Sequence, residues 1–549
     1  MGKRLKEYTR DNTKCMVKVN GEMLIDRVMN HLERLGVGRV VVVTGYKGEA
    51  LRKHLGNRHG SLPIEYVDNP DYSRTNNIYS LWLAKDRLQE DDTLLLESDL
   101  IFDYEMIEAL ARNPEPNLAL TAKYEPWMDG TMVQIDKDCN IVNFVPKKAF
   151  DFRYVDTYYK TVNIYKFSRE FSTGKYVPFL EAYIKAVGNN EYYENVLSII
   201  TFLNSSALKA LPVEHGKWYE IDDKQDLDIA ELIFAPDGEI LQKLYGRRGG
   251  FWRVPRMLDF FHPVNVAFAS SKIADELVAN FRTLLPSLPS SAPTVSLLAS
   301  KNWNVKEEYV VVGGCVETLV SILMRGALAG GAAERLSNPD RITGRLIPRS
   351  ELLERALEMK KSGGTLIVDE TAIDFCDNPG EASLLSNDIL AEHPEIVVVK
   401  DIAETYGVAG LQLGMLCSSN VGLVNAVLEL NSCGVNAVAE FFLQILSKYE
   451  ADFERSCNAL RSERDNLADA LSHVEGLQVV PSQGDSIFCA TVAPVKADEI
   501  ALSLLKKHGI AVRVVKEPAC KGLRFAVRGS ADNRRLVSAL HKVVEHCKE

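Results

Sequence analysis

The sequence predicts an α/β protein with two domains, and three observations lead to this class. Its 549 residues exceed what one hydrophobic core usually organises, while an apolar fraction of 46% is enough to fill two cores. Runs rich in Val, Ile and Leu alternate with segments of helical period, which is typical of strands buried on both faces of a parallel sheet. The alternation breaks at 234–238 and resumes after a basic, aromatic and glycine-rich stretch at 245–253. We therefore expect one domain over 1–238, a linker over 239–251 and a second domain over 252–549.

The first domain contains two predicted strands whose carboxyl ends are candidate binding positions. Residues 39–44 form one strand, and residues 93–97 form another that leads directly into Asp99. Ligands of open α/β sheets bind at these carboxyl ends. Asp99 is therefore a candidate site residue.

Charge and composition exclude several classes of function. The formal net charge of −11 argues against a nucleic acid or an anionic membrane as the main partner, because phosphate backbones need clustered positive charge. The ten cysteines are scattered without a C-x-x-C pair, and no apolar run reaches membrane-spanning length. We expect a cytoplasmic protein with no nucleic-acid partner and no membrane insertion, in which local basic sites suit small anionic ligands.

The chain starts with basic residues around a glycine, which is one way to bind phosphates. Gly2 would let backbone N–H groups approach phosphate oxygens, and Arg4 and Lys14 would neutralise the charge that develops on them. A basic terminus of this kind is also common as a solvated tail, so the pattern leaves both interpretations open.

Two aspartates in the first domain are candidate metal ligands. Asp99 follows an apolar strand, and Asp222 lies in the segment 218–223. Mg²⁺ takes one or two carboxylates together with substrate phosphate oxygens, so the pair would suffice beside a bound triphosphate. The alternative is that Asp99 caps a turn and Asp222 caps the helix that follows.

Eight short motifs follow one another along the first domain. They are residues 2–5 (Gly-Lys-Arg-Leu), 12–14 (Asn-Thr-Lys), 18–21 (Lys-Val-Asn-Gly), 75–80 (Thr-Asn-Asn-Ile-Tyr-Ser), 97–99 (Glu-Ser-Asp), 127–130 (Trp-Met-Asp-Gly), 192–194 (Tyr-Tyr-Glu) and 218–222 (Trp-Tyr-Glu-Ile-Asp). In this ordered set the domain resembles the sugar-nucleotidyltransferase-like phosphocholine cytidylyltransferases, a subgroup that also activates phosphoethanolamine or 2-aminoethylphosphonate. The resemblance implies a Rossmann-like nucleotidyltransferase fold and Mg²⁺-dependent transfer of CMP from CTP to a phosphate or phosphonate oxygen, with release of pyrophosphate.

The resemblance also implies roles for individual residues. Arg4 would contact the outer phosphates and Lys14 the α-phosphate, while Asp99 and Asp222 would hold Mg²⁺. The candidates for binding the base or ribose are Asn76, Asn77 and Ser80, whose alternative role is to order a helix entrance. The candidates for binding the substrate amine are Trp127, Asp129, Tyr192, Tyr193 and Glu194, whose alternative is a half-buried aromatic cluster.

The start of the chain departs from this family, whose members begin with an apolar strand and a small-residue turn before the equivalent of Gly2. That strand lies centrally in the family's sheet, and its removal would leave backbone groups of neighbouring strands unpaired, at about 1 to 3 kcal/mol for each buried group. We expect either that Met1 is internal to the natural chain or that the domain is crippled, and we favour the former. The mass of the intact native protein distinguishes the two.

A second set of motifs lies beyond residue 252. It consists of residues 313–317 (Gly-Gly-Cys-Val-Glu), 338–344 (Asn-Pro-Asp-Arg-Ile-Thr-Gly), 368–370 (Val-Asp-Glu), 401–410 (Asp-Ile-Ala-Glu-Thr-Tyr-Gly-Val-Ala-Gly) and 522–524 (Gly-Leu-Arg). Here the chain resembles the fold-type I, class I/II aminotransferases, which use pyridoxal phosphate (PLP). Asp369 is retained as the partner of the pyridinium nitrogen, and Arg524 as the group that would hold a substrate carboxylate.

Other positions implied by this resemblance have lost their chemistry. Glu404 stands where the family has the Schiff-base lysine, and a carboxylate cannot form an imine. Asp401 and Gln412 replace phosphate-binding Ser and Arg, and Arg341 replaces an Asn that bonds the ring hydroxyl. Asn338 follows Glu317 by only 21 positions, which indicates a deletion that includes the aromatic residue stacked on the cofactor. The vestigial site consists of Gly314, Asp369, Asp401, Glu404, Gln412 and Arg524.

We therefore expect no covalently bound PLP and a degenerate second domain. Lys400, near the end of a strand, is expected to point elsewhere rather than to replace the missing lysine. A homodimer through the second domain is expected, because aminotransferases of this type share active sites between subunits.

Three functional classes follow: a cytidylyltransferase for a small amine-bearing phosphate or phosphonate, an active PLP-dependent aminotransferase, and a non-catalytic scaffold. The sequence favours them in that order, and a sugar-1-phosphate nucleotidyltransferase is the alternative within the first fold. It leaves open which amine substrate is used and whether the nucleotide is CTP.

Overall fold

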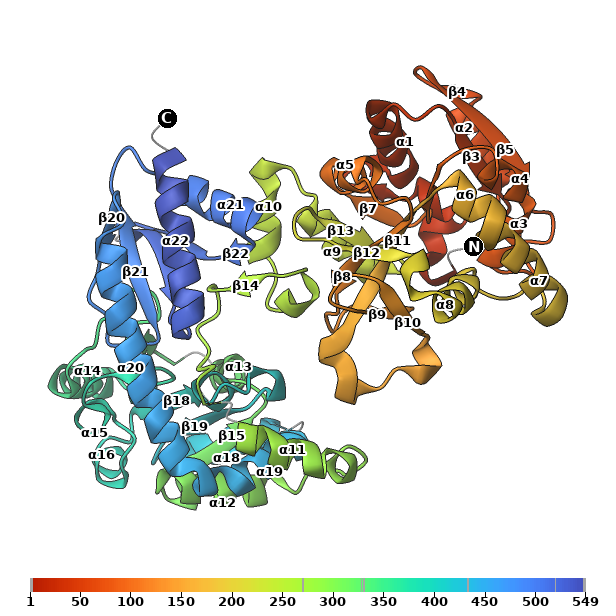
Figure 1. The fold of residues 1–549 in the computed structure, drawn as a ribbon. Coiled ribbons are helices and arrows are strands. Elements are labelled where there is room, and N and C mark those ends of the chain that lie inside the picture. Colours follow the sequence, from red (N-terminus) through yellow and green to blue (C-terminus); the bar gives the residue numbers. More distant parts are fainter. Residues whose placement is uncertain are drawn as a thin grey trace. The chain divides into compact units, whose positions relative to one another are not determined.

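The computed structural model describes residues 3–268, 271–326, 328, 331–431, 434–518 and 520–546. The chain divides into two compact units, Met1–Pro255 and Arg256–Glu549 (Figure 1). Most of the segment predicted as a linker, 239–251, belongs to helix α10 (Asp237–Tyr245). This segment is tied to the first unit, because Lys243 Nζ donates to Asn20 Oδ1 at 2.8 Å. The division therefore falls after the predicted linker rather than within it.

The largest sheet of the first unit has the order β10-β9-β11-β8-β12, with β6 also paired to β11. These strands are β6 (Thr93–Leu96), β8 (Leu118–Lys123), β9 (Met132–Ile135), β10 (Ile141–Val145), β11 (Tyr158–Phe167) and β12 (Lys209–Pro212). Strand β11 runs antiparallel to β6, β8 and β9, whereas β12 and β8 are parallel. The sheet is thus mixed and not parallel as predicted, because the ten-residue β11 pairs with β9 through its first residues and with β6 through its last.

A separate sheet of the first unit contains β3 (Val40–Thr44), β5 (Leu62–Asp68) and β4 (Arg58–His59). Strands β3 and β5 are parallel, with Val40 opposite Ile64. Within the described ranges β3 pairs with no strand but β5, and its four valines are half-buried. The expectation that a strand is missing from this domain stays a prediction.

Two short strands connect distant parts of the first unit. Strand β7 (Leu100–Phe102) pairs antiparallel with β13 (Trp218–Glu220), so that Leu100 faces Glu220. The pairing extends by one bond beyond the strands, because Ile221 N–H donates to the carbonyl of Asp99 at 2.9 Å. Leu100, Phe102 and Trp218 all belong to the same hydrophobic core. This pairing brings the residues after β6 and after β13 together. A further pair joins β1 (Lys18–Val19) to β2 (Glu22–Met23).

The helices of the first unit surround these sheets. Besides α10 they are α1 (Leu24–Leu35), α2 (Gly48–Leu55), α3 (Asn77–Leu83), α4 (Lys85–Leu88), α5 (Tyr104–Arg112), α6 (Arg169–Phe171), α7 (Val177–Val187), α8 (Glu194–Leu203) and α9 (Lys224–Ile233). Asp223 caps α9 by accepting hydrogen bonds from Gln225 N–H and Asp226 N–H, while Asp226 reaches back to the cap, so both form a capping box. The cap is therefore Asp223, and Asp222 is left for other contacts.

The second unit is built on a five-stranded sheet of order β15-β19-β18-β17-β16. The strands are β15 (Val310–Gly313), β16 (Ala333–Ser337), β17 (Thr365–Asp369), β18 (Ile396–Asp401) and β19 (Gly414–Cys417). Strands β16, β17 and β18 are parallel, and β19 is antiparallel to both neighbours. Val397 and Val398 are fully buried in different clusters on opposite faces, as predicted for a strand covered on both sides.

A smaller antiparallel sheet follows in the order β20-β21-β24-β23, from β20 (Leu477–Val479), β21 (Ser486–Thr491), β23 (Arg513–Glu517) and β24 (Cys520–Ala526). Strand β14 (Leu258–Asp259) pairs with β22 (Ile510–Ala511). The helices are α11 (Ser271–Leu284), α12 (Ala292–Trp303), α13 (Val316–Arg325), α14 (Arg349–Lys361), α15 (Pro379–Ala382), α16 (Asn387–Glu392), α17 (Ile402–Thr405), α18 (Val421–Leu430), α19 (Ala437–Ile445), α20 (Glu450–Ser472), α21 (Ala497–His508) and α22 (Ser530–His546). Across the described parts of the chain, no helix is both long enough and apolar enough to cross a bilayer.

Candidate functional site

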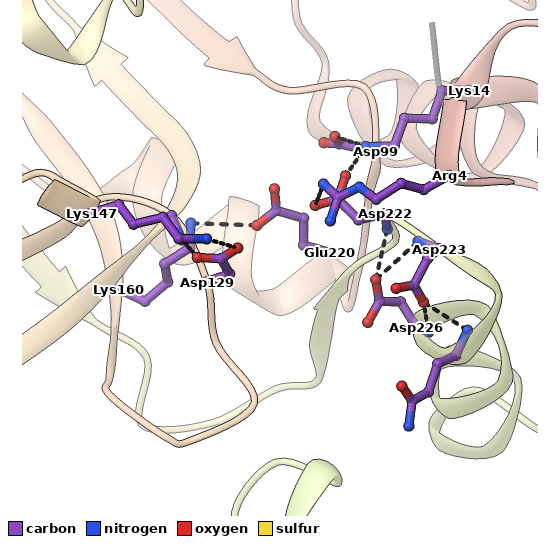
Figure 2. Close-up of polar contacts among 12 residues, drawn as sticks. Arg4, Lys14, Asp99, Asp129, Lys147, Lys160, Glu220, Asp222, Asp223 and Asp226 are labelled. Atoms are coloured by element: carbon purple, nitrogen blue, oxygen red, sulfur yellow. Dashed lines mark hydrogen bonds and ion pairs between the residues drawn. The ribbon is translucent and has the colours of Figure 1, made fainter. Parts of the chain in front are cut away.

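The predicted catalytic and metal residues of the first unit lie together (Figure 2). Lys14 Nζ donates to Asp99 Oδ2 at 2.5 Å and to Asp222 Oδ1 at 2.7 Å. Arg4 Nη2 lies 2.8 Å from Asp222 Oδ2. Four residues from three distant segments of the sequence thus form one charged cluster. Gly2 lies outside the described residues.

A third carboxylate joins the two predicted metal ligands. Asp99, Glu220 and Asp222 each offer an oxygen atom, and these atoms lie within 4.8 Å of one another. Among the described residues the buried Asp99 Oδ1 has no hydrogen-bond partner, so it has capacity for a further ligand. A set of carboxylate oxygens is what Mg²⁺ prefers, and the residues therefore fit this ion. Sequence reasoning missed Glu220 as a ligand, although it lies in the same short motif as Asp222, two positions before it.

The electrostatics of the cluster favour charged side chains. Burial alone would lower the pKa of Lys14, but Asp99 and Asp222 outweigh it, so the pKa is raised and the ammonium is retained. Burial alone would raise the pKa of Asp222, but Lys14 and Arg4 outweigh it and lower that pKa. Glu220 differs, because burial raises its pKa more than Lys160 lowers it.

Further polar groups interact with residues of this cluster. Burial, followed by the charges of Asp99 and Glu194, raises the pKa of Glu97 to about 8. Asn77 Nδ2 donates to Glu97 Oε1 at 3.1 Å, and Lys160 Nζ lies 3.4 Å from Glu220 Oε2. Burial also raises the pKa of Glu194, whose Oε2 has no hydrogen-bond partner among the described residues.

The residues predicted to bind the base or ribose make contacts within the protein. Asn76 caps α3 by accepting from Asn77 N–H, which is the helix-entrance role given as the alternative. Asn77 Oδ1 accepts from Tyr193 N–H at 3.1 Å, and Ser80 Oγ accepts from Asn69 Nδ2 at 3.0 Å.

A cavity of about 160 Å³ adjoins the charged cluster, and only some of the predicted amine-binding residues line it. Its walls are formed by Arg4, Trp127, Met128, Asp129, Lys160, Trp218, Glu220, Asp222, Asp223, Asp226 and Arg253. Trp127 stacks on Tyr219 with ring centroids 4.4 Å apart. Asp129 is exposed and pairs with Lys147 at 2.9 Å.

The remaining predicted amine-binding residues do not line this cavity. Tyr192 is 56% exposed, whereas Tyr193 and Glu194 are buried. Tyr193 packs edge-on against Tyr165 in a different hydrophobic cluster. The structure thus brings Trp127 and Asp129 to the charged cluster and leaves residues 192–194 outside the cavity wall.

In the second unit, the end of β18 and the start of α17 form the centre of the predicted vestigial site. Asp401 Oδ1 accepts from Glu404 N–H at 2.9 Å, and Glu404 Oε2 lies 2.5 Å from Arg341 Nη2. Burial, followed by the charge of Glu404, raises the pKa of Asp401 to about 7. Glu404 and Arg341 thus hold each other in an ion pair at this position.

The other predicted residues of this site have distinct surroundings. Asp369 Oδ1 accepts from Thr371 N–H and Oγ–H. Arg524 donates to the carbonyls of Arg341 and Phe261, at 2.9 and 2.6 Å, so two of its donors are occupied by the protein.

Gly314, Gln412 and Lys400 lie around the same strands. A Cβ atom on Gly314 would lie 3.9 Å from the Gln412 carbonyl, and Gln412 has a left-handed φ of 54°. Lys400 is buried and bonds Asp374, and it does not line the cavity that Asp401 and Glu404 share.

Comparison with known proteins identifies both parts of the chain. The MobA-like NTP transferase domain matches residues 1–134, and aminotransferase class I and II matches residues 334–540. CMP-5'-(3-aminopropyl)phosphonate synthase of Streptomyces rubellomurinus is 27% identical, over 99% of this chain and 94% of that protein. CTP:phosphoglutamine cytidylyltransferase of Campylobacter jejuni is 25% identical, over 42% of this chain and 94% of its own length. 2-aminoethylphosphonate cytidylyltransferase of Lancefieldella rimae is 35% identical, over 20% of this chain and 42% of its own length.

Proposed function

We propose that the first domain of this chain, which is a fusion of a MobA-like NTP transferase (cytidylyltransferase) domain with a class I and II aminotransferase domain, transfers CMP from CTP to a small amine-bearing phosphonate. The observation that carries the proposal is the cluster of Lys14, Asp99, Glu220 and Asp222. Two relatives whose names specify aminoalkyl phosphonates favour a phosphonate over an amino-alcohol phosphate.

The proposed reaction is an in-line displacement at phosphorus. An oxygen of the phosphonate forms a bond to the α-phosphorus of CTP, and the bond from that phosphorus to the bridging oxygen of pyrophosphate breaks. Asp99, Glu220 and Asp222 would hold Mg²⁺, which neutralises charge on phosphate oxygens when it is bound. Lys14 and Arg4 supply fixed positive charge beside those oxygens.

The cavity beside the cluster suits a zwitterionic substrate. Its walls carry five carboxylates and three basic side chains, so both an ammonium group and an anionic group find partners. Trp127 contributes an aromatic ring, to which cations are attracted, to the same cavity wall as the carboxylate of Glu220. We assign amine binding to this wall rather than to residues 192–194.

A substrate screen tests the proposed function. Full-length protein is incubated with CTP, Mg²⁺ and one acceptor, and pyrophosphate is measured. We expect release with 3-aminopropylphosphonate or 2-aminoethylphosphonate to exceed that with phosphocholine, phosphoethanolamine or a sugar 1-phosphate. Release with sugar 1-phosphates alone would contradict the proposal, and replacement of CTP by UTP tests the nucleotide.

We further propose that the second domain does not carry out aminotransferase chemistry. Pyridoxal phosphate does not fit the residues present, because Glu404 stands at the position expected for the amine that would react with its aldehyde, and Asp401 stands at a position expected to bind its phosphate. Added pyridoxal phosphate should give no visible absorption band of an imine, in the native chain or in Glu404→Lys. A band in the native chain would overturn this assignment.

A further inference from the structure

The segment that follows α10 contributes a basic side chain to the first unit. Arg253 ends a short 3₁₀ helix over Phe251–Arg253, and it lines the cavity beside the charged cluster. Phe251 and Val254 are buried, so the segment is anchored by side chains on both sides of Arg253. Residues 252–255 thus belong to the first unit, although the sequence predicts that the second domain begins at 252.

Arg253 forms an ion pair with Asp226, which lies in the first turn of α9. Arg253 Nη2 is 3.1 Å from Asp226 Oδ1, and the two side chains are only 17% and 16% exposed. Exposed ion pairs contribute little to stability, but a largely buried carboxylate that loses its cation is left uncompensated. Arg253 therefore helps to hold the Asp226 carboxylate where it is.

The other oxygen of Asp226 holds the backbone of the predicted metal ligand Asp222. Asp226 Oδ2 accepts hydrogen bonds from the N–H groups of Asp222 and Asp223, both at 3.0 Å (Figure 2). The carboxylate of Asp222 extends from this backbone to the basic residues of the charged cluster. Two contacts in series thus connect Arg253 to Asp222.

A second arginine of the same segment contacts the same helix at a different place. Arg247 pairs with the carboxylate of Asp228 and donates to the Asp228 carbonyl at 3.0 Å. The Asp228 side chain is 60% exposed, and neither residue is among the described residues that line the cavity. Arg247 therefore braces α9 without a contact to Asp226, which makes it a matched control for Arg253.

We propose that Arg253 is a positioning residue, which acts by holding Asp226 and thereby the backbone of Asp222. This keeps the Asp222 carboxylate beside those of Asp99 and Glu220. The proposal rests on the proposed function for the divalent cation that these carboxylates would bind. Residues that orient metal ligands contribute about 10- to 100-fold to metal affinity or activity. The segment after α10 is thus part of the active site of the first domain.

Mn²⁺ binding to the full-length, nucleotide-free protein, measured by electron paramagnetic resonance, tests this role. We expect Arg253→Met to bind Mn²⁺ about tenfold more weakly than the native chain. Arg253→Lys keeps a cation for Asp226 and should recover most of the affinity, whereas Arg247→Met should bind as the native chain does. Equal affinity in Arg253→Met and Arg247→Met would overturn the role, and so would a loss in Arg253→Lys as large as that in Arg253→Met.

A double-mutant cycle tests whether Arg253 acts through Asp226. Asp226→Asn keeps an oxygen acceptor for the Asp222 N–H but loses the charge that pairs with Arg253. If the two residues act in series, the double variant should bind Mn²⁺ no more weakly than the weaker of the two single variants. Losses that multiply in the double variant would overturn the connection through Asp226. Circular dichroism shows whether each variant is folded, and Arg253→Gln replaces Arg253→Met if that variant is not.

Kinetics distinguish positioning from substrate binding and from the proposed function. Arg253→Met should need more Mg²⁺ for half-maximal pyrophosphate release, with an unchanged KM for 3-aminopropylphosphonate. A raised KM for the phosphonate with unchanged Mn²⁺ affinity would assign Arg253 to the substrate and overturn positioning. Pyrophosphate release by the native chain, with equal Mn²⁺ affinity in Arg253→Met, overturns this inference alone. Weaker Mn²⁺ binding in Arg253→Met, without release by the native chain, supports this inference and overturns the proposed function.

Discussion

At the scale of single residues, Lys14 is the most informative side chain. Its ammonium group lies between Asp99 and Asp222, at hydrogen-bonding distance from both. The same two carboxylates belong to the group that would hold a divalent cation. Lys14 is therefore a competitor of the metal when the substrate is absent, and a source of positive charge for the phosphates when it is present.

Lys14→Met should separate these two effects. Without the competing ammonium, Mn²⁺ should bind to the nucleotide-free protein about tenfold more tightly, measured by electron paramagnetic resonance. Pyrophosphate release should fall by about 10² to 10³, because fixed charge beside the transition state is lost. Lys18→Met, at an exposed position, is the control. Weaker Mn²⁺ binding in Lys14→Met would contradict the competition.

The sequence predicted part of this residue-scale picture. Arg4, Lys14, Asp99 and Asp222 could be chosen because they lie in an ordered set of motifs that resembles the cytidylyltransferases, whereas each one alone also suits a solvated tail or a cap. Lys160 could not, since it is a buried lysine inside a ten-residue strand and only the fold shows that Glu220 faces it.

At the scale of elements, the pairing of β13 with β7 builds the site. Trp218 lies opposite Phe102 and is 3% exposed, so its ring fixes β13 in the core. The same pairing places Asp222 beside Asp99. Just beyond the two strands, Ile221 N–H donates a hydrogen bond to the carbonyl of Asp99, and Asp222 is the next residue. Sequence patterns identify strands but not which short strands pair across more than a hundred residues.

Trp218→Ala should weaken both the fold and the site. Removal of a buried Trp ring costs about 3 to 5 kcal/mol of the free energy of unfolding. We expect a lower denaturation midpoint and, in the folded fraction, weaker Mn²⁺ binding. Trp252→Ala is the control, since Trp252 is 59% exposed. Unchanged Mn²⁺ affinity in Trp218→Ala would show that the pairing does not position the metal ligands.

The mixed sheet shows that the positions of strands could be predicted from the sequence but their directions could not. Apolar runs correctly indicated β3 and β6, because a run of Val, Thr and Leu between polar segments is itself a strand signal, although the side chains of both strands are mostly half-buried. The direction of β11 left none, since antiparallel and parallel buried strands share the same composition.

At the scale of the whole molecule, stability should depend on pH through Glu370. Burial raises the pKa of this carboxyl to about 7, although hydrogen bonds from Leu384 N–H and Ser383 Oγ–H oppose the shift. The folded state therefore favours the protonated form. Its contribution to stability is complete below the unfolded pKa of about 4.3 and is lost as the pH rises through about 7.

Glu370→Gln should flatten this dependence. Between pH 5 and 8, the native chain should lose on the order of 3 kcal/mol more of its free energy of unfolding than the variant does. Urea denaturation at several pH values measures the difference. Parallel curves for the two proteins would rule out Glu370 as the titrating group.

The predicted homodimer through the second domain also belongs to this scale. We expect light scattering of the full-length chain to give twice the mass of 61.2 kDa. A monomer at micromolar concentration would count against it.

Pyrophosphate release from CTP and Mg²⁺ in the presence of 3-aminopropylphosphonate, compared between the native chain and Asp99→Asn, tests the central claim most directly. Asp138→Asn, at an exposed turn in the same domain, is the matched control. The proposed site requires release by the native chain and by Asp138→Asn, and a loss of about 10² to 10³ in Asp99→Asn. Equal release by native protein and Asp99→Asn would contradict it.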